Sequence, residues 1–425
     1  MTFRQPLLLP LAALCLLGLP WASGAQPTPA KPQTGAAQPT ATKPRARDLG
    51  IPFGGQPGAL DAITDVPGIE VGHTTLISGQ GPLVKGKGPV RTGVTAVWPR
   101  GKASAATPVF AATYALNGNG EMTGTHWLNE SGLLHGPLMI TNTFSVGTVH
   151  EAVIAWASKK GLAWDLGLPV VAETYDGILN DVEGFHVKAE HVFRALDGAS
   201  GGPVAEGSVG GGTGMMCHGF KGGIGTASRK LPEAQGGYTV GVLVQCNYGR
   251  RKLFSVAGVP VGEEITDLQA CTTSSKPPSN PMFRRVLPCT EKGASQPSFR
   301  EGQGSIIIVV ATDAPLLSHQ LGRLARRVPL GIGKMGGLGE DSSGDIFLAF
   351  STQATQPAGE SPVAAVSMLA NARMDPLFEA TVQATQAAIL NAMLAADTMT
   401  GADGVRVFAL PHERLQEAMK KYGRK

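Results

Sequence analysis

Apolar and polar positions alternate along most of the chain in segments that predict short strands and amphipathic helices. Residues 306–310 are apolar, β-branched and continuous, which predicts a strand covered on both faces. The pattern predicts further strands at 93–99, 108–114, 138–143, 169–177, 238–249 and 341–351, and helices at 149–160, 184–196, 315–327 and 375–396. This loose alternation indicates a layered α/β protein with mixed sheets.

The composition adds two constraints to this picture. Hydrophobic residues make up 42% of the chain and charged residues 16%, which favours a sizeable core over disorder. The 57 glycines indicate many tight loops, and two glycine-rich loops are expected at 207–216 and 331–339. The formal net charge of +4 is scattered without a basic stripe, so no nucleic-acid partner is expected.

The N-terminal segment has the features of a targeting sequence. Arg4 precedes a leucine-rich run that ends at small residues before Ala25, which predicts a secretory signal peptide over 1–25. Residues 26–47 are rich in Pro, Ala, Thr and Gln and predict a disordered linker. We therefore expect a folded region over 48–425, a periplasmic location, and no membrane association once the signal is removed.

The cysteines outside the signal divide into two pairs. Cys217 and Cys246 lie in apolar contexts and are interpreted as buried thiols. Cys271 and Cys289 flank a proline-rich loop and are candidates for a disulfide in an oxidising compartment. The spacing of Cys and His matches no zinc site, and neither metal nor cofactor is expected.

Ser305 stands at the junction between a polar loop and the 306–310 strand, directly after Gly304. One interpretation is an ordinary turn residue. The other is a nucleophile that becomes a new N-terminus when the Gly304–Ser305 bond is cut. An α-amine has a pKa of about 8, so it can serve as general base for the hydroxyl of the same residue. The histidines form no evident triad, which leaves room for such a base.

Seven segments resemble, in order, the DmpA/BapA family of L-aminopeptidase D-amidase/D-esterases and β-peptidyl aminopeptidases. They are 117–121, 141–147, 173–177, 211–215, 244–249, 304–307 and 311–316. The resemblance covers about residues 48–412. It implies an αββα sandwich that resembles ornithine acetyltransferase and is analogous to N-terminal nucleophile hydrolases.

The same resemblance implies a self-processing serine peptidase without metal or cofactor. Cleavage before Ser305 would give an α chain (26–304) and a β chain (305–425) that stay together, and the family's usual assembly is a homotetramer. The implied reaction releases N-terminal residues from short peptides, amides or esters through an acyl-enzyme.

Matching the family's motifs residue by residue implies the roles of the site. Ser305 would be the nucleophile, and Asn247 would donate its side-chain amide to the oxyanion. Ser343 and Asp345 match the family's serine and acidic residue near the nucleophile's amine. The family often has Glu in place of Asp345, so this carboxylate has a shorter reach here.

Two further residues complete the implied site. Tyr175 matches an active-site tyrosine, a candidate oxyanion or substrate contact. Glu173 matches a carboxylate that can pair with the free amino terminus of a substrate, which would make the enzyme an aminopeptidase.

Two other functions remain open at this point. An acetyltransferase of the ornithine acetyltransferase type would share the fold, but such enzymes use threonine as the new N-terminus and are cytoplasmic. A non-catalytic periplasmic protein could use its glycine loops to bind a small anion. The sequence does not distinguish L-, D- and β-amino-acid substrates.

Overall fold

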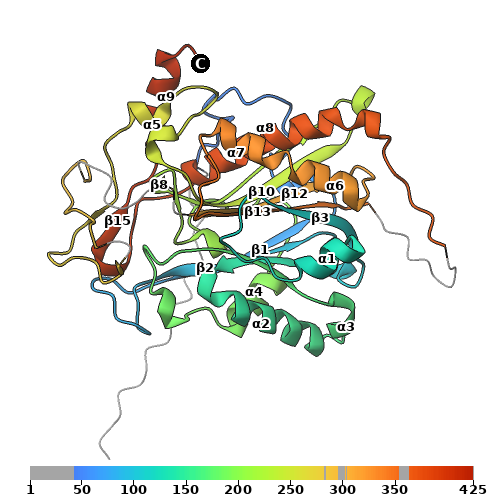
Figure 1. Cartoon of the computed structure of the whole chain (residues 1–425), viewed down its shortest axis with the longest axis horizontal. Helices are drawn as coiled ribbons and strands as arrows, with labels where there is room; N and C mark the ends of the chain where they lie inside the picture. Colours follow the sequence, from blue (N-terminus) through green and yellow to red (C-terminus); the bar gives the residue numbers. More distant parts are fainter. Residues whose placement is uncertain (1–42, 282–283, 295–301, 303, 354–362, 425) are drawn as a thin grey trace, which may run out of the picture. The chain divides into compact units, whose positions relative to one another are not determined.

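The computed structural model describes residues 43–281, 284–294, 302, 304–353 and 363–424, apart from the side chain of Trp164. The predicted signal peptide lies outside these residues, as does nearly all of the predicted linker. Residues 43–425 form one compact unit, which includes residues 43–47 ahead of the expected boundary at Asp48. Figure 1 traces this unit in sequence order.

Two main sheets form the centre of the described unit. The larger has the order β4-β3-β13-β12-β10-β9, with β4 at Leu133–Leu134, β3 at Val109–Ala115, β13 at Gly344–Ser351, β12 at Ser305–Thr312, β10 at Thr239–Asn247 and β9 at Gly223–Lys230. The smaller has the order β1-β2-β5-β6, with β1 at Glu70–Ser78, β2 at Val90–Trp98, β5 at Leu138–Asn142 and β6 at Val170–Thr174.

Strand β12 shows why the two sheets stack. Successive side chains of a strand point to opposite faces. Ile307 and Val309 pack in one cluster with side chains of the smaller sheet, such as Ile140, whereas Ile306 and Ile308 pack among the helices on the other face. The strand is buried along its whole length, as its continuous apolar pattern predicts.

Helices cover the outer face of each sheet. On the larger sheet lie α6 (Ser318–Ala325), α7 (Val328–Lys334) and α8 (Asp375–Leu394), and on the smaller lie α2 (Val146–Lys159), α3 (Ala163–Leu166) and α4 (Ala189–Asp197). Figure 1 shows the two helix layers on opposite sides of the stacked sheets. The result is the αββα arrangement that the resemblance implies.

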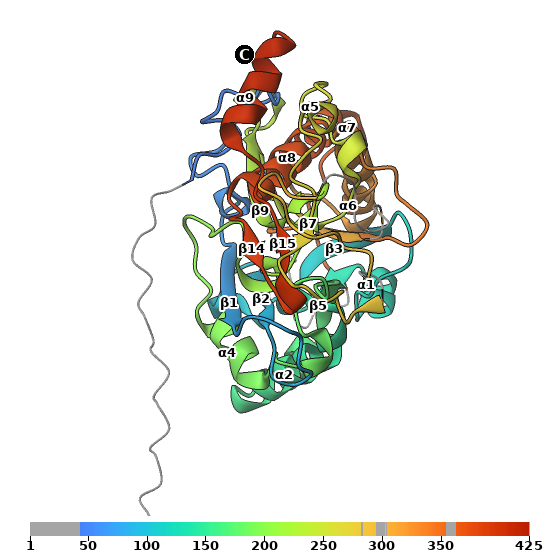
Figure 2. The ribbon, with the colours of Figure 1, turned by 90° about the vertical axis from the view of Figure 1, so that its left-hand side faces the viewer.

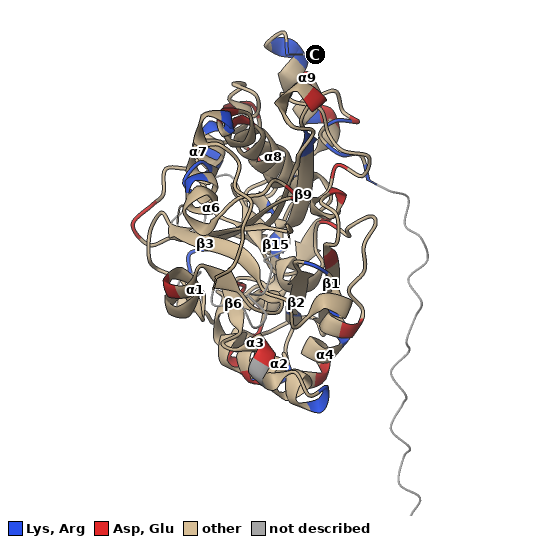
Figure 3. Cartoon of the chain, turned by 90° about the vertical axis from the view of Figure 1, so that its right-hand side faces the viewer, with Lys and Arg blue, Asp and Glu red and all other residues tan. Residues whose placement is uncertain are grey.

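Besides several 3₁₀ turns, the described residues form shorter α-helices and strands. They are α1 (Thr125–Ser131), α5 (Val261–Glu264), α9 (His412–Lys421), the sheet β11 (Cys271–Thr272), β15 (Val405–Val407) and β14 (Met399–Thr400), and the hairpin β7 (Met216–Cys217) and β8 (Phe220–Lys221). Figure 2 shows β14 and β15 side by side. In Figure 3, Lys, Arg, Asp and Glu are dispersed over the outer helices. Within the described residues, no helix is both long and apolar enough for a membrane span.

Two expectations are corrected by the structure. The glycine-rich segment 331–339 does not begin as a loop, because α7 runs to Lys334. Pro329 lies in the first turn of this helix, and Gly331 lets the helix approach α8, since a Cβ there would lie 2.8 Å from Thr385.

The prediction of buried thiols is also wrong. Cys217 and Cys246 form a disulfide, because the β7–β8 hairpin folds back beside the end of β10 and brings their Cα atoms to 5.6 Å. Their separation of 29 residues conceals this proximity in the sequence. Cys271 and Cys289 form the disulfide that was considered for them.

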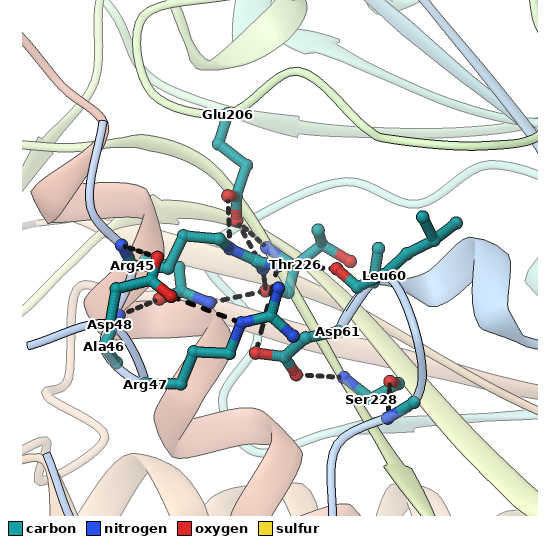
Figure 4. Close-up of polar contacts among 12 residues, drawn as sticks. Arg45, Ala46, Arg47, Asp48, Leu60, Asp61, Glu206, Thr226 and Ser228 are labelled. Atoms are coloured by element: carbon teal, nitrogen blue, oxygen red, sulfur yellow. Dashed lines mark hydrogen bonds and ion pairs between the residues drawn. The ribbon is translucent and has the colours of Figure 1, made fainter. Parts of the chain in front are cut away.

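The start of the unit is fixed by buried charges (Figure 4). The Arg45 guanidinium pairs with Glu206 at 2.9 Å and donates to the carbonyl of Leu60 at 2.8 Å. The Thr226 amide donates to Glu206 at 2.8 Å, which ties the cluster to β9. Burial raises the pKa of Glu206 to about 7, opposed by the charge of Arg45. The ion pair between Arg45 and Glu206 thus helps to attach the start of the described chain to the sheet.

We expect Arg45→Met to lower the free energy of unfolding by about 3 kcal/mol at pH 8, because breaking a buried pair leaves Glu206 without its counter-charge. The loss should be smaller at pH 5. Without Arg45 the pKa of Glu206 rises further above its ordinary value of 4.5, so the folded state binds the proton more tightly and stability falls as pH rises. Urea unfolding at both pH values measures this.

Arg47→Met is the matched control, since the Arg47 side chain is 40% exposed and pairs only loosely with Asp48 at 3.6 Å. The double variant Arg45→Met/Glu206→Gln should recover much of the loss. An equal effect of Arg45→Met at pH 5 and pH 8 would contradict the assignment.

Candidate active site

The site is built at one end of the larger sheet, where β12 begins between two neighbours. In the antiparallel pairing with β10, Ser305 lies opposite Asn247, and in the parallel pairing with β13 it lies beside Gly344. Ser305 is 6% exposed. The register of three buried strands therefore places these residues side by side.

One backbone amide contacts both groups that the predicted cleavage before Ser305 would involve. The Gly344 N–H donates to Ser305 Oγ at 3.1 Å and to the carbonyl oxygen of Gly304 at 3.4 Å. A donor at a carbonyl stabilises the negative charge that develops there when a nucleophile attacks. The Ser305 hydroxyl and the carbonyl of the preceding peptide bond thus accept hydrogen bonds from the same amide.

The glycine at 304 is required by the same close packing. A Cβ at Gly304 would lie 2.1 Å from the carbonyl oxygen of Asn247 and 3.1 Å from the Cα of Tyr248, both backbone atoms. The segment before Ser305 therefore runs directly against the end of β10.

Ser343 and Asp345 form a hydrogen-bonded pair around Gly344. Ser343 Oγ donates to Asp345 Oδ1 at 2.7 Å, and Asn117 Nδ2 donates to Asp345 Oδ2 at 3.2 Å. Burial raises the pKa of Asp345, while the hydrogen bonds from Ser343, Asn117 and the Ile306 amide oppose the rise. The carboxylate thus reaches the backbone directly after Ser305.

Asn247 is held at both ends of its side-chain amide. Its Oδ1 accepts from the Met216 amide at 2.8 Å, and its Nδ2 donates to the carbonyl of Tyr175 at 3.0 Å. A carboxamide nitrogen has two N–H groups, so one remains after the bond to Tyr175. Asn247 is 6% exposed and can present this second donor at the mouth of β12.

Glu173 is the penultimate residue of β6 in the smaller sheet and is 3% exposed. It accepts hydrogen bonds from the Glu121 amide at 3.0 Å and from the hydroxyl of Thr143. Burial raises the pKa of Glu173, and these two bonds oppose the rise. A carboxylate offers about four acceptor positions, so Glu173 retains capacity for a further donor.

The loop 117–121 joins the two halves of the site. The Asn119 amide donates to the carbonyl of Ser343 at 3.1 Å, and the Glu121 amide donates to Glu173. Segment 117–121 is one of those that carry the family resemblance, but no role was predicted for it or for the Gly344 amide. A backbone donor cannot be recognised from the residue type. The closely spaced glycines of the loop, in contrast, were a signal that could have pointed to its role.

The structure thus gathers Ser305, Asn247, Ser343 and Asp345 at the ends of β10, β12 and β13. Tyr175 joins them through its carbonyl, and Glu173 joins through the loop 117–121. Among the residues described, no group of three or more His, Cys, Asp or Glu side chains is placed to bind a metal ion.

Comparisons with known proteins agree with this arrangement. The model of peptidase family S58 matches residues 61–407. The chain belongs to peptidase family S58. A relative in Sphingosinicella microcystinivorans, the β-peptidyl aminopeptidase BapA, is 53% identical over 382 residues, covering 90% of this chain and 93% of that protein.

This S58 member also resembles solved structures. A Burkholderia β-aminopeptidase is 46% identical with a TM-score of 0.75, covering 89% of this chain and 99% of that one. The L-aminopeptidase D-Ala-esterase/amidase of Ochrobactrum anthropi, described as a variant of the Ntn hydrolase fold, is 42% identical with a TM-score of 0.76, covering 90% and 99%.

These findings confirm the DmpA/BapA resemblance and the αββα fold of the N-terminal nucleophile type. They also confirm that the chain is a hydrolase of the aminopeptidase class. The roles of the individual site residues stay predictions.

Gly344→Ala should slow the predicted cleavage before Ser305 at least tenfold. A Cβ there would lie 2.5 Å from the carbonyl oxygen of Asn119, so β13 must shift and carry the Gly344 amide away from Ser305. The precursor fraction is followed on a denaturing gel. Gly118→Ala in the same loop is the control, since a Cβ there meets no atom within 4 Å. Equal processing of both variants would contradict the role of this amide.

Proposed function

We propose that this S58 peptidase is made as a precursor that cleaves its own Gly304–Ser305 bond and then uses Ser305 as nucleophile. The observation that carries the proposal is the shared donor, because the Gly344 amide contacts both Ser305 Oγ and the Gly304 carbonyl. The proposed processing makes an α chain (26–304) and a β chain (305–425).

The proposed cleavage proceeds through an ester. Ser305 Oγ attacks the carbonyl carbon of Gly304, the C–N bond breaks, and the hydroxyl proton passes to the departing nitrogen. Water then hydrolyses the ester, which gives a carboxylate on Gly304 and restores the hydroxyl. Ser305 is left with a free α-amine beside its own oxygen.

In the proposed peptidase reaction that amine is the general base. It takes the proton of Ser305 Oγ as the hydroxyl attacks the substrate carbonyl, and it returns a proton to the leaving amine. The free N–H of Asn247 and the Gly344 amide would hold the oxyanion, a role worth about 3–4 kcal/mol of barrier for one donor. Water then releases the acyl group from Ser305.

Asp345 and Glu173 would serve two different amines. Asp345, with Ser343, would stabilise the protonated α-amine of Ser305, since an adjacent carboxylate favours the charged form. Glu173 would bind the free amino terminus of the substrate, which would restrict hydrolysis to the first residue. We propose a further contact from Tyr175 to the substrate or oxyanion.

We propose that the substrates are short peptides, amides or esters, with β-amino acids as the preferred N-terminal residue. The support for this preference is the set of curated relatives named β-peptidyl aminopeptidases, at 53% and 48% identity. The Ochrobactrum relative is named as an L-aminopeptidase and D-Ala-esterase/amidase. L- and D-residues are therefore the alternative preference. A panel of β-homo-alanine, L-Ala and D-Ala p-nitroanilides distinguishes them.

We further propose a periplasmic location and assembly as a homotetramer. The expected signal peptide over 1–25 supports export. The disulfides Cys217–Cys246 and Cys271–Cys289 fit an oxidising compartment, because disulfides persist there and are rare in the cytosol.

Ser305→Ala should abolish processing and peptidase activity, because it removes the hydroxyl that both reactions need. The wild type should show two chains on a denaturing gel, with a fragment that begins Ser-Ile-Ile-Ile by Edman degradation, and the variant one. Ser342→Ala, in the nearby loop, should process normally. A wild type that remains one chain yet hydrolyses peptides would rule out the α-amine as base.

Asp345→Asn should shift the acidic limb of the kcat/KM profile to lower pH by about one unit. The base must be unprotonated, and loss of a nearby negative charge lowers the pKa of the α-amine, so the active form persists at lower pH. The maximum rate should fall as well, since the amine loses its orientation. Asp341→Asn, at an exposed position, is the control. An unchanged acidic limb would show that Asp345 does not influence the pKa of the base.

A further inference from the structure

The disulfide between Cys271 and Cys289 closes a loop on the N-terminal side of the cleavage site. Here "disulfide loop" means the described residues 271–281 and 284–289. Its first strand, β11, pairs with β15, so that Cys271 lies opposite Arg406 and Thr272 opposite Val405. The loop belongs to the proposed α chain, whereas β15 belongs to the proposed β chain.

Asp403 fastens the disulfide loop from the β-chain side. It is 7% exposed and has a left-handed backbone with φ 55°. Its Oδ2 accepts from the Ser279 amide at 2.6 Å and its Oδ1 from the Leu83 amide at 2.7 Å. Its carbonyl accepts from Thr272 Oγ1 at 2.8 Å. The loop is thereby held in place independently of the Gly304–Ser305 bond.

Asn280, directly after Ser279, brings the disulfide loop to the active site. Its Nδ2 donates to the hydroxyl oxygen of Tyr175 at 3.0 Å and to the carbonyl of Gly177 at 3.1 Å. The carbonyl of Gly177 can only accept, so the atom of Asn280 that faces both partners is the nitrogen. The orientation of this amide therefore follows from its partners.

Tyr175 is fixed from several sides. Its ring folds back over Gly177, where a Cβ would lie 2.2 Å from the hydroxyl oxygen. Its carbonyl accepts from Asn247, and its hydroxyl oxygen accepts from Asn280. A continuous set of contacts thus leads from the disulfide loop through Tyr175 to the candidate oxyanion donor.

We propose that Asn280 is a positioning residue that makes the Tyr175 hydroxyl a hydrogen-bond donor to the bound substrate. A phenol has one proton and two lone pairs. Because Asn280 donates to the oxygen, the phenolic O–H is directed elsewhere and is available to an acceptor in the site. The disulfide and Asp403 hold Asn280 at that place.

This inference rests on the proposed role of Tyr175. A double-mutant cycle tests the role of Asn280 separately from that of Tyr175. Asn280→Ala should lower kcat/KM about tenfold, the effect of one neutral hydrogen bond, while processing into two chains continues. Tyr175→Phe should lower kcat/KM by at least as much. In the Tyr175→Phe background, Asn280→Ala should have no further effect, because its target oxygen is gone.

Asn280→Asp provides a readout that a purely structural role would not give. The aspartate has nearly the same shape but only accepts hydrogen bonds, so it turns the Tyr175 O–H toward itself. It should lower kcat/KM at least as far as Asn280→Ala. Lys276→Ala, at an exposed position of the disulfide loop, should leave kcat/KM unchanged.

The outcomes distinguish a failure of the proposed Tyr175 role from a failure of the inference about Asn280. If Tyr175→Phe retains full activity, the proposed role of Tyr175 fails and the inference fails with it. If Tyr175→Phe is impaired but Asn280→Ala and Asn280→Asp match the wild type, the inference alone is overturned. Additive losses in the double variant would also overturn it, because Asn280 would then act by another route.

Discussion

The register of three adjacent strands is the constraint on which the site depends. Pairing of β12 with β10 and β13 sets Asn247, Ser305 and Gly344 in one row at the end of the sheet. A slip of one residue would turn every side chain of β12 to the opposite face, so that Ile307 and Val309 would leave their places against the smaller sheet. The close packing of both faces therefore also secures the position of the nucleophile to within a residue.

Close backbone approaches refine what the register establishes. Gly344 lies against the loop 117–121, which in turn donates to Glu173 on the other sheet. Gly304 lies against the end of β10. The glycines at these points bring the Gly344 amide within reach of Ser305 and the Glu121 amide within reach of Glu173. The site is consequently made as much of backbone donors as of side chains.

This balance explains how far the sequence could be interpreted. Apolar periodicity predicted β12, α2 and α8 closely, because burial on one or both faces leaves a local pattern. The motifs predicted the side chains that meet at the site. The Gly344 amide had no signal, because every residue except proline has the same donor. The Cys217–Cys246 disulfide and the Asn280–Tyr175 bond were also missed, since each depends on loops that are distant in the sequence.

The same sheet explains how a chain can be cut between two paired strands and stay folded. β10 precedes the proposed cleavage point, whereas β12 and β13 follow it. The ladder between β10 and β12 runs from Asn247 opposite Ser305 to Val240 opposite Thr312. Helix α8, from the second part, packs on β9 and β10 of the first. Scission would break one covalent bond and none of these contacts. The free energy of the core is therefore retained, while the freed amine gains the mobility to turn toward its own hydroxyl.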